Sequence, residues 1–151
     1  MTKISKAFVD TNVLIRSLTT TAPLHHEADA LLKRVRGEDA ELWISRQVIR
    51  EYIAQSTRPQ AYQKPLPVEQ LLQRVESMET LYTVADDTAE VTTHLLALLR
   101  EHPAGGKQVH DVNIVATMLA YGIDTLLTHN VEDFRRFESK ITIVPLVKET
   151  T

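Results

Sequence analysis

The segment KAFVDTNVLI, residues 6–15, guides the interpretation of the rest of the chain. A short apolar run ends on one carboxylate, Asp10, and two small polar residues, Thr11 and Asn12, separate it from a second apolar run. Residues of this kind commonly cap the helix that follows them. They can also ligate a metal ion or orient its ligands. Taken alone, the segment leaves both interpretations open.

The composition is that of an ordinary globular protein. The chain has 151 residues, 43% of them hydrophobic and 25% charged, which suits one domain spanning residues 1–151. No apolar run approaches the roughly 20 residues needed to span a bilayer, and Asp10 interrupts the only early run a signal peptide could use. With no cysteine, disulfides and thiolate metal sites are excluded. We therefore expect a cytoplasmic protein without a membrane segment.

Short β-like runs alternate with longer helical patterns, which favours an α/β fold with a small parallel sheet and helices on both faces. Two glycines, Gly37 and Gly122, predict helix ends, and the sequence Asp87 to Glu90 resembles a capping box. Strands are expected at 4–9, 42–44, 81–84, 125–128 and 141–144. Helices are expected at 13–18, 24–36, 45–56, 68–78, 87–101, 109–121 and 131–137, with a proline-rich loop at 57–67.

A parallel sheet brings acids from distant segments to one edge. The carboxyl ends of its strands and the amino ends of its helices lie together, and ligands bind there. Asp10 ends the first strand, Glu51 lies in the second turn of the helix after the second strand, and Asp111 opens the helix before the fourth. Asn130 follows that fourth strand, and Asp133 lies one turn further on. We expect these five residues to converge.

Carboxylates held close together repel one another unless a cation intervenes. A hard divalent ion such as Mg²⁺ or Mn²⁺ prefers oxygen ligands, and it can activate a water and stabilise a phosphodiester during in-line displacement. Thr11, Asn12 and Thr128 are small hydrogen-bonding residues that could orient the ligands or the phosphate. Each acid also has a simpler interpretation as a helix cap, a solvated charge or a first-turn residue favoured by the helix dipole. Their shared edge favours the metal site.

Four segments resemble the motifs of PIN-domain ribonucleases, especially VapC-type toxins. They are FVDTNVLI at 8–15, SRQVIREYIAQSTRP at 45–59, VHDVNIVATMLAYG at 109–122 and LLTHNVEDFRRF at 126–137. The resemblance covers nearly the whole chain and implies a metal-dependent endoribonuclease that uses Mg²⁺ or Mn²⁺. It makes Asp10 and Asp111 the principal metal ligands, with Glu51 completing the acidic cluster. The supporting residues would be Thr11, Asn12 and Thr128.

One departure from the family pattern concerns the fourth acid. Many relatives carry Asp where this chain has Asn130, so Asp133 becomes the candidate for the missing charge, and the number of metal ions stays open. The resemblance also implies an RNA substrate, a VapB-like antitoxin and a homodimer. The helices at 24–35 and 68–75 are candidate interaction surfaces. Basic residues near the motifs could hold the RNA backbone: Arg46, Arg50, Arg58, Lys107, Arg135 and Arg136.

Two other functions compete with the nuclease. A haloacid-dehalogenase-like phosphatase also begins with a strand ending in Asp, but it needs an acid two residues later, where this chain has Asn12. A non-catalytic PIN-like module that binds RNA or protein is the main alternative, and Asn130 would suit it. The presence of Asp10, Glu51 and Asp111 favours catalysis over that module.

Overall fold

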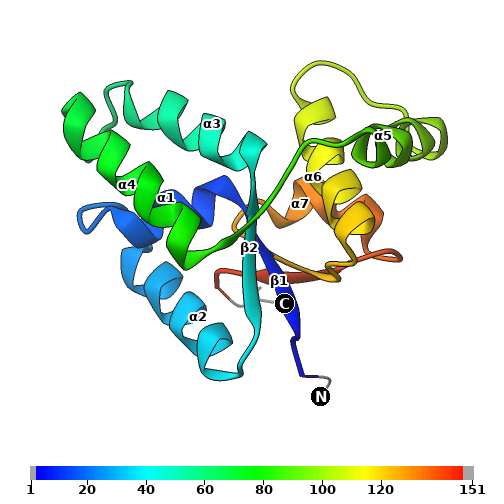
Figure 1. The fold of residues 1–151 in the computed structure, drawn as a ribbon, viewed down its shortest axis with the longest axis horizontal. Coiled ribbons are helices and arrows are strands. Elements are labelled where there is room, and N and C mark those ends of the chain that lie inside the picture. The colour runs from blue at the N-terminus through cyan, green and yellow to red at the C-terminus, as the bar shows by residue number, and fades with distance from the viewer. Residues whose placement is uncertain (1–2, 148–151) are drawn as a thin grey trace.

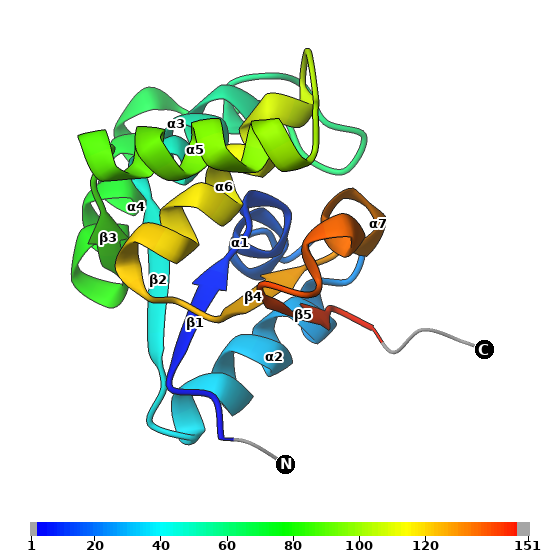
Figure 2. The same ribbon diagram turned by 90° about the vertical axis from the view of Figure 1, so that its right-hand side faces the viewer.

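The structure, a computed structural model that describes residues 3–147, contains a five-stranded sheet between two layers of helices (Figures 1 and 2). All neighbouring strands are parallel, and their order is β3-β2-β1-β4-β5. This arrangement confirms the α/β fold expected from the sequence. The strands are β1 (Lys6–Val9), β2 (Glu41–Ser45), β3 (Thr83–Ala85), β4 (Thr125–Thr128) and β5 (Thr142–Pro145).

Helices cover both faces of the sheet. In Figure 1, α1 to α4 lie on one side of the central strands and α5 to α7 on the other. The helices are α1 (Thr11–Leu18), α2 (His25–Gly37), α3 (Arg46–Ser56), α4 (Val68–Leu81), α5 (Ala89–Glu101), α6 (Gln108–Tyr121) and α7 (Val131–Phe134), with a 3₁₀ turn, η1, at Arg135–Phe137. None of the helices within residues 3–147 is long and apolar enough to cross a membrane.

The strand order reverses between β1 and β4. The chain first adds β2 and β3 on one side of β1, then crosses to place β4 and β5 on the other. The two central strands stay in register to their ends, where the Asp10 amide donates to the Leu127 carbonyl at 3.0 Å. Such a reversal leaves a crevice outside the carboxyl ends of the strands. Asp10 and Thr128 therefore lie at the topological switch point.

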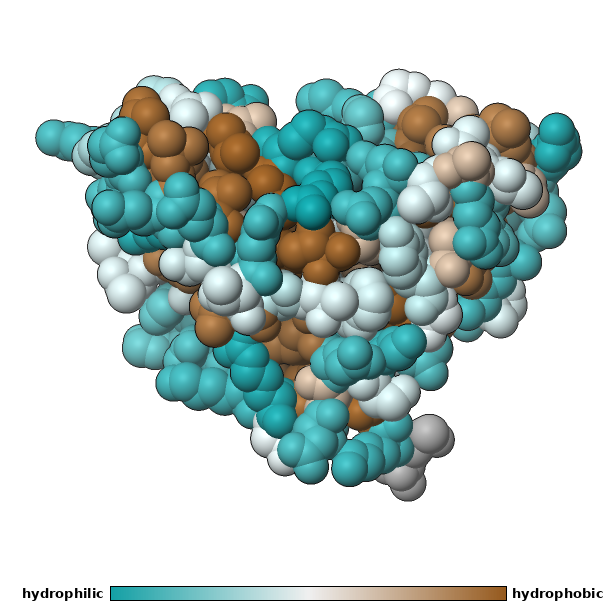
Figure 3. Space-filling model, in the orientation of Figure 1, coloured by the Kyte–Doolittle hydropathy of each residue, from teal (hydrophilic) through white to brown (hydrophobic). Residues whose placement is uncertain are grey.

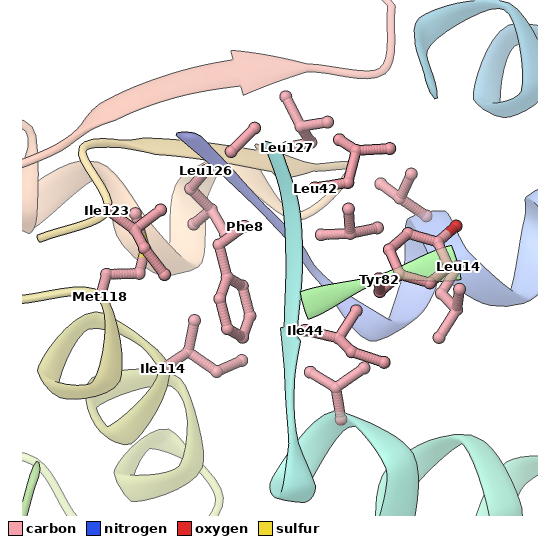
Figure 4. Packing of buried hydrophobic residues seen from close by; sticks show 14 of the residues in the cluster. Phe8, Leu14, Leu42, Ile44, Tyr82, Ile114, Met118, Ile123, Leu126 and Leu127 are labelled. Carbon is pink, nitrogen blue, oxygen red and sulfur yellow. The ribbon is translucent and has the colours of Figure 1, made fainter. Parts of the chain in front are cut away.

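The core is built on both faces of β1, which is buried after its first residue. Figure 4 shows Phe8 pointing towards Ile114 and Met118 of α6, while Leu14 and Tyr82 lie on the opposite side of β2. Since a strand buried on both faces cannot shift by one residue without exposing one apolar set, this packing fixes where β1 ends. The position of Asp10 follows from it.

Helix α6 differs from the single apolar face that its sequence predicts. The residues from 114 to 118 are all buried, with Val112 before them. The reason is that α5 covers the side of α6 that faces away from the sheet (Figure 2). As predicted, α6 ends at Gly122, which adopts φ +68°, a conformation that glycine accepts without steric cost.

The expected start of α5 is wrong by one residue. Thr88, and not Asp87, is the N-cap, and its hydroxyl accepts a hydrogen bond from the Val91 amide at 3.3 Å. The Asp87 carboxylate instead pairs with Arg50 at 3.3 Å. A capping box requires the cap and the acid to be three residues apart, so moving the cap to Thr88 removes it.

Other bounds shift by a few residues. Helix α4 continues to Leu81, beyond the expected end at 78, and β3 accordingly begins at Thr83. At the end of α2, Gly37 is still helical, and the left-handed residue is Asp39 at φ +60°. The chain before Lys6 is not part of β1, and the segment expected as one helix at 131–137 divides into α7 and η1. None of these shifts moves the expected site residues.

Candidate functional site

The Asp10 carboxylate is 6% exposed and is held by three donors at the end of β1. Oδ1 accepts from the Thr11 amide at 2.8 Å, while Oδ2 accepts from Asn12 Nδ2 at 2.9 Å and from the Thr128 hydroxyl at 2.7 Å. Asp10 is also the N-cap of α1. The cap and the candidate ligand are therefore the same residue, and one lone pair of Oδ1 remains available.

The loop after β4 is tied to α1 through the same group. The Asn12 side-chain oxygen accepts from the His129 amide at 3.0 Å, and the Thr128 hydroxyl accepts from the Asn130 amide at 3.0 Å. Thr128 thus bridges the Asp10 carboxylate and the loop backbone. Asn130 joins this network through its backbone, while its side chain is largely exposed.

Glu51 belongs to a second network, which sequence reasoning missed. Its Oε1 accepts from Gln47 Nε2 at 3.1 Å, and the same nitrogen donates to the His110 carbonyl at 2.9 Å. Gln47 Oε1 accepts from Asn113 Nδ2 at 2.8 Å. The signal available in the sequence was the spacing, because Gln47 and Glu51 are four residues apart and share a helix face.

Asp111, in the first turn of α6, completes the acidic cluster. Burial raises its pKa to about 6, helped by the negative charges of Asp133, Asp10 and Glu51, in that order. The charge of Arg136 acts in the opposite direction. Among the charges that raise the pKa of Asp111, that of Asp133, the exposed acid of α7, has the largest effect.

The other two acids have raised pKa values as well. Burial raises the pKa of Asp10 to about 6, against the lowering effect of its hydrogen bonds, above all that from Thr128. Burial also raises the pKa of Glu51, and the Gln47 hydrogen bond is the main effect that lowers it. Thr11 approaches Glu51 closely enough to lower its pKa slightly, although no hydrogen bond of good geometry forms.

The donor set suits a hydrated divalent ion better than a preformed cage. Within residues 3–147, no three acids or histidines come close enough to enclose a metal by themselves. Mg²⁺ commonly keeps several waters and binds through one or two carboxylates. The Thr11 hydroxyl is buried at this edge and has no hydrogen-bond partner within residues 3–147. The residues present fit an ion held mainly by Asp10 and Asp111.

The basic residues near the motifs differ in what they contact. Arg46 and Arg50 form ion pairs with acids of neighbouring segments, and Arg135 is bound to Glu132. Arg136 is the one whose charge acts on Asp111, and it also lies over the Phe137 ring at 4.9 Å. Arg58 and Lys107 are exposed. Arg136 is therefore the best-placed candidate for a phosphate contact.

Residues 7–140 match the PIN domain family, and the chain belongs to that family. Its fold is similar to a toxin–antitoxin complex from Klebsiella pneumoniae, at 20% identity and a TM-score of 0.67, covering 95% of this chain and 99% of that one. VapBC-1 from nontypeable Haemophilus influenzae is similar at 21% identity and a TM-score of 0.65, with coverages of 95% and 99%.

A third similar structure is VapC20 from Mycobacterium tuberculosis, described as a toxin that cleaves the sarcin-ricin loop. It is 16% identical, with a TM-score of 0.63, and the match covers 86% of this chain and 94% of that one. No curated protein sequence matches the chain. At these identities the likeness to solved structures establishes the fold.

Proposed function

We propose that this chain is a Mg²⁺- or Mn²⁺-dependent endoribonuclease and the cytoplasmic toxin of a VapBC-type pair. The observation that supports the proposal is a buried, hydrogen-bonded carboxylate, Asp10, at the switch point of the sheet, whose charge acts on Asp111 together with that of Glu51. The fold likeness to toxins, one of them described as cleaving the sarcin-ricin loop, supports the choice of RNA.

Asp10 and Asp111 would hold the divalent ion, which when bound supplies positive charge to the phosphate oxygens and lowers the pKa of a water. The three donors on Asp10 keep its carboxylate in one orientation and leave one lone pair of Oδ1 for an ion. Glu51 Oε1 is occupied by Gln47, and we assign to Oε2 the acceptance of the proton from the attacking water. Arg136 would hold a phosphate of the RNA backbone beside Asp111.

Cleavage of a structured RNA pool tests this function. Purified protein is incubated with the pool in Mn²⁺, in Mg²⁺ and in EDTA, and the products are mapped at their ends. The proposal expects internal cuts that require the metal. A folded chain that neither cuts the pool nor gains thermal stability from Mn²⁺ would instead support the non-catalytic interaction module.

The antitoxin partner would bind between α2 and α4, the two helices singled out in the sequence. A groove of about 490 Å³ lies between them and α1. Its apolar floor includes Leu18, Leu32 and Met78, and its charged residues are Lys33, Arg36 and Arg74 against a single acid, Asp29. In Figure 3, apolar residues gather over α4, whose Val68 and Leu72 are exposed. This charge balance suits a partner segment that is apolar and acidic.

The partner proposal is tested with the product of a neighbouring VapB-like reading frame. Charge reversal at two groove positions, Arg36→Glu with Arg74→Glu, is expected to weaken binding of that product without changing Mn²⁺ affinity. The matched control reverses Arg34, an exposed cation of α2 that does not line the groove. Equal affinity in the groove variant and the control would contradict this docking site.

A homodimer is the last part of the proposal. Leu96 is 48% exposed on α5, on the side of the molecule away from the groove. Light scattering of the purified chain at micromolar concentration is expected to give the mass of two chains, and Leu96→Glu to shift it towards one. The mass of a single chain for the unaltered protein would contradict the dimer.

A further inference from the structure

Gln47 is a buried polar side chain that the proposed chemistry does not itself use. It is 5% exposed, and its amide makes three hydrogen bonds: to Glu51 on its own helix, and to His110 and Asn113 of α6. Both donor positions of the amide are occupied. An amide with every donor satisfied in a buried position is costly to remove.

The contacts of the Gln47 amide fix its orientation. Nε2 faces two acceptors, the Glu51 carboxylate and the His110 carbonyl, while Oε1 faces the Asn113 amide nitrogen. Turning the amide over would bring its oxygen against two other oxygens and its nitrogen against a donor. Only the observed orientation satisfies all three neighbours.

The Gln47 amide joins two helices, α3 and α6, that pack mainly against other elements. Helix α3 packs on α1 and α4, and α6 packs on α5 and α7. Glu51 lies on α3, and Asp111 directly follows His110, whose carbonyl accepts from Gln47. The amide therefore connects the carboxylate of one helix to the backbone turn that carries the other acid.

We propose that Gln47 is a positioning residue that sets the spacing between the Glu51 carboxylate and the first turn of α6, so that Glu51 acts through a water on the divalent ion that Asp111 helps to hold. This inference rests on the proposed function, because it concerns the same site. Outer residues that orient metal ligands commonly change metal affinity by about 10- to 100-fold when they are replaced. Gln47→Leu should therefore weaken Mn²⁺ binding by about tenfold.

The experiment compares Gln47→Leu with Val48→Ala, a neighbouring buried position on α3 whose side chain has no polar group. Calorimetric titration gives the Mn²⁺ affinity, and thermal unfolding in EDTA gives the stability of each metal-free chain. Val48→Ala is expected to lose stability while keeping its Mn²⁺ affinity. In a Glu51→Ala background, Gln47→Leu should weaken Mn²⁺ binding by less than about twofold, since the interaction it supports is already absent.

A second variant covers the case in which Gln47→Leu does not fold. Asn113→Ala removes the donor to Gln47 Oε1 and leaves the contact to Glu51, so a smaller loss of Mn²⁺ affinity in the same direction is expected. Unchanged Mn²⁺ affinity in the folded variants would overturn the inference, and so would an equal loss in Val48→Ala. If the unaltered chain binds Mn²⁺ but cuts no RNA, while Gln47→Leu binds Mn²⁺ more weakly, the inference stands and the nuclease proposal fails. A folded, unaltered chain that binds no Mn²⁺ would overturn both.

Discussion

The two principal acids of the site are held in opposite ways. Asp10 is almost fully buried and fixed by three hydrogen bonds from α1 and β4, whereas Asp111 is half-buried and surrounded by other negative charges. Burial is the largest cause of the raised pKa, about 6, in both. The second cause differs: hydrogen bonds oppose the shift at Asp10, and neighbouring acids increase it at Asp111.

Because of this difference, replacing Asp10 and replacing Asp111 should have different effects on stability and activity. Replacing Asp10 disturbs a hydrogen-bonded cap and a strand end, so its effects combine stability with chemistry. Replacing Asp111 removes a charge that like charges already disfavour, so the fold should lose little. A variant of Asp111 therefore tests function with little change in stability. A variant of Asp10 tests how much the burial of a charge costs the folded state.

The largest effect is expected from Asp111→Asn. Loss of a direct metal ligand should reduce metal-dependent RNA cleavage by more than the roughly 100-fold seen on losing an outer partner, since the ion itself is then poorly held. Thermal unfolding in EDTA should show a stability no lower than that of the unaltered chain. Asp39→Asn is the control, because it makes the same chemical change at an exposed turn. Cleavage retained by Asp111→Asn would contradict the assignment.

The pH dependence of stability tests the Asp10 side. A carboxyl whose pKa is raised from 3.8 to about 6 by folding keeps its proton in the folded state while the unfolded chain loses it. Without metal, the free energy of unfolding should therefore fall as pH rises from about 4 to 7, with at most about 3 kcal/mol from Asp10. Asp111 and Glu51 act in the same direction.

Denaturant titrations in EDTA at pH 5.0 and 7.5 measure this fall. Asp10→Asn should reduce it, and Asp39→Asn should leave it unchanged. The surface acids Asp29 and Glu132 have lowered pKa values, so their contribution to stability changes with pH in the opposite direction to that of Asp10. Equal stability of the unaltered chain at both pH values would contradict the burial of ionised carboxylates at this edge.

A smaller effect is expected from Thr128→Val. The hydroxyl donates to Asp10 at 2.7 Å and accepts from the Asn130 amide at 3.0 Å, so its removal leaves a buried carboxylate oxygen and a partly buried amide each short of one partner. The cost should be about 1–3 kcal/mol in denaturant titrations. Thr125→Val, at the other end of the same strand, removes only a bond to the exposed Asp124 and should cost less. Equal losses of stability in Thr128→Val and Thr125→Val would show that the hydrogen bond to Asp10 contributes no extra stability.

The smallest effect concerns the basic residues. Arg136→Gln should lower the salt dependence of RNA binding by about one counterion, because one phosphate contact is lost. Arg46→Gln should leave it nearly unchanged, since Arg46 is already paired with Glu79 and Asp86. Filter binding of an RNA oligomer to Asp111→Asn carrying each change, at several salt concentrations, separates the two. If RNA affinity depended on salt concentration equally in the two variants, Arg136 would not contact the RNA.

The parallel sheet and the place of Asp10 at its carboxyl edge could be predicted because both follow from local patterns. An apolar run that ends on Asp10 marks a buried strand, and alternating helices favour parallel pairing, so the carboxyl ends of the strands share one edge. The role of Thr128 was likewise accessible as a small polar residue at a strand end. These features depend on the spacing of apolar residues and on the order of strands and helices along the chain, and both can be read from the sequence.

Other features depend on long-range contacts that no local pattern encodes. Gln47 meets Asn113 across 66 positions of the chain, and nothing near Gln47 indicates that partner. The cap of α5 could not be located because Asp87 and Thr88 are both good caps, and the contact with Arg50 decided between them. The burial of residues 114–118 of α6 on every side likewise depends on α5 covering the outer face of that helix.

Calorimetric titration of Mn²⁺ into the metal-free chain at pH 7.5 and 5.5 tests the central claim most directly, namely that the acids at the β1–β4 switch point form a divalent metal site. Because the ion needs ionised carboxylates and two of the acids have pKa values near 6, binding should be clear at pH 7.5, weaker at pH 5.5 and lost in Asp111→Asn. Absence of binding to the folded chain at pH 7.5, or binding that is equal in Asp111→Asn, would contradict it.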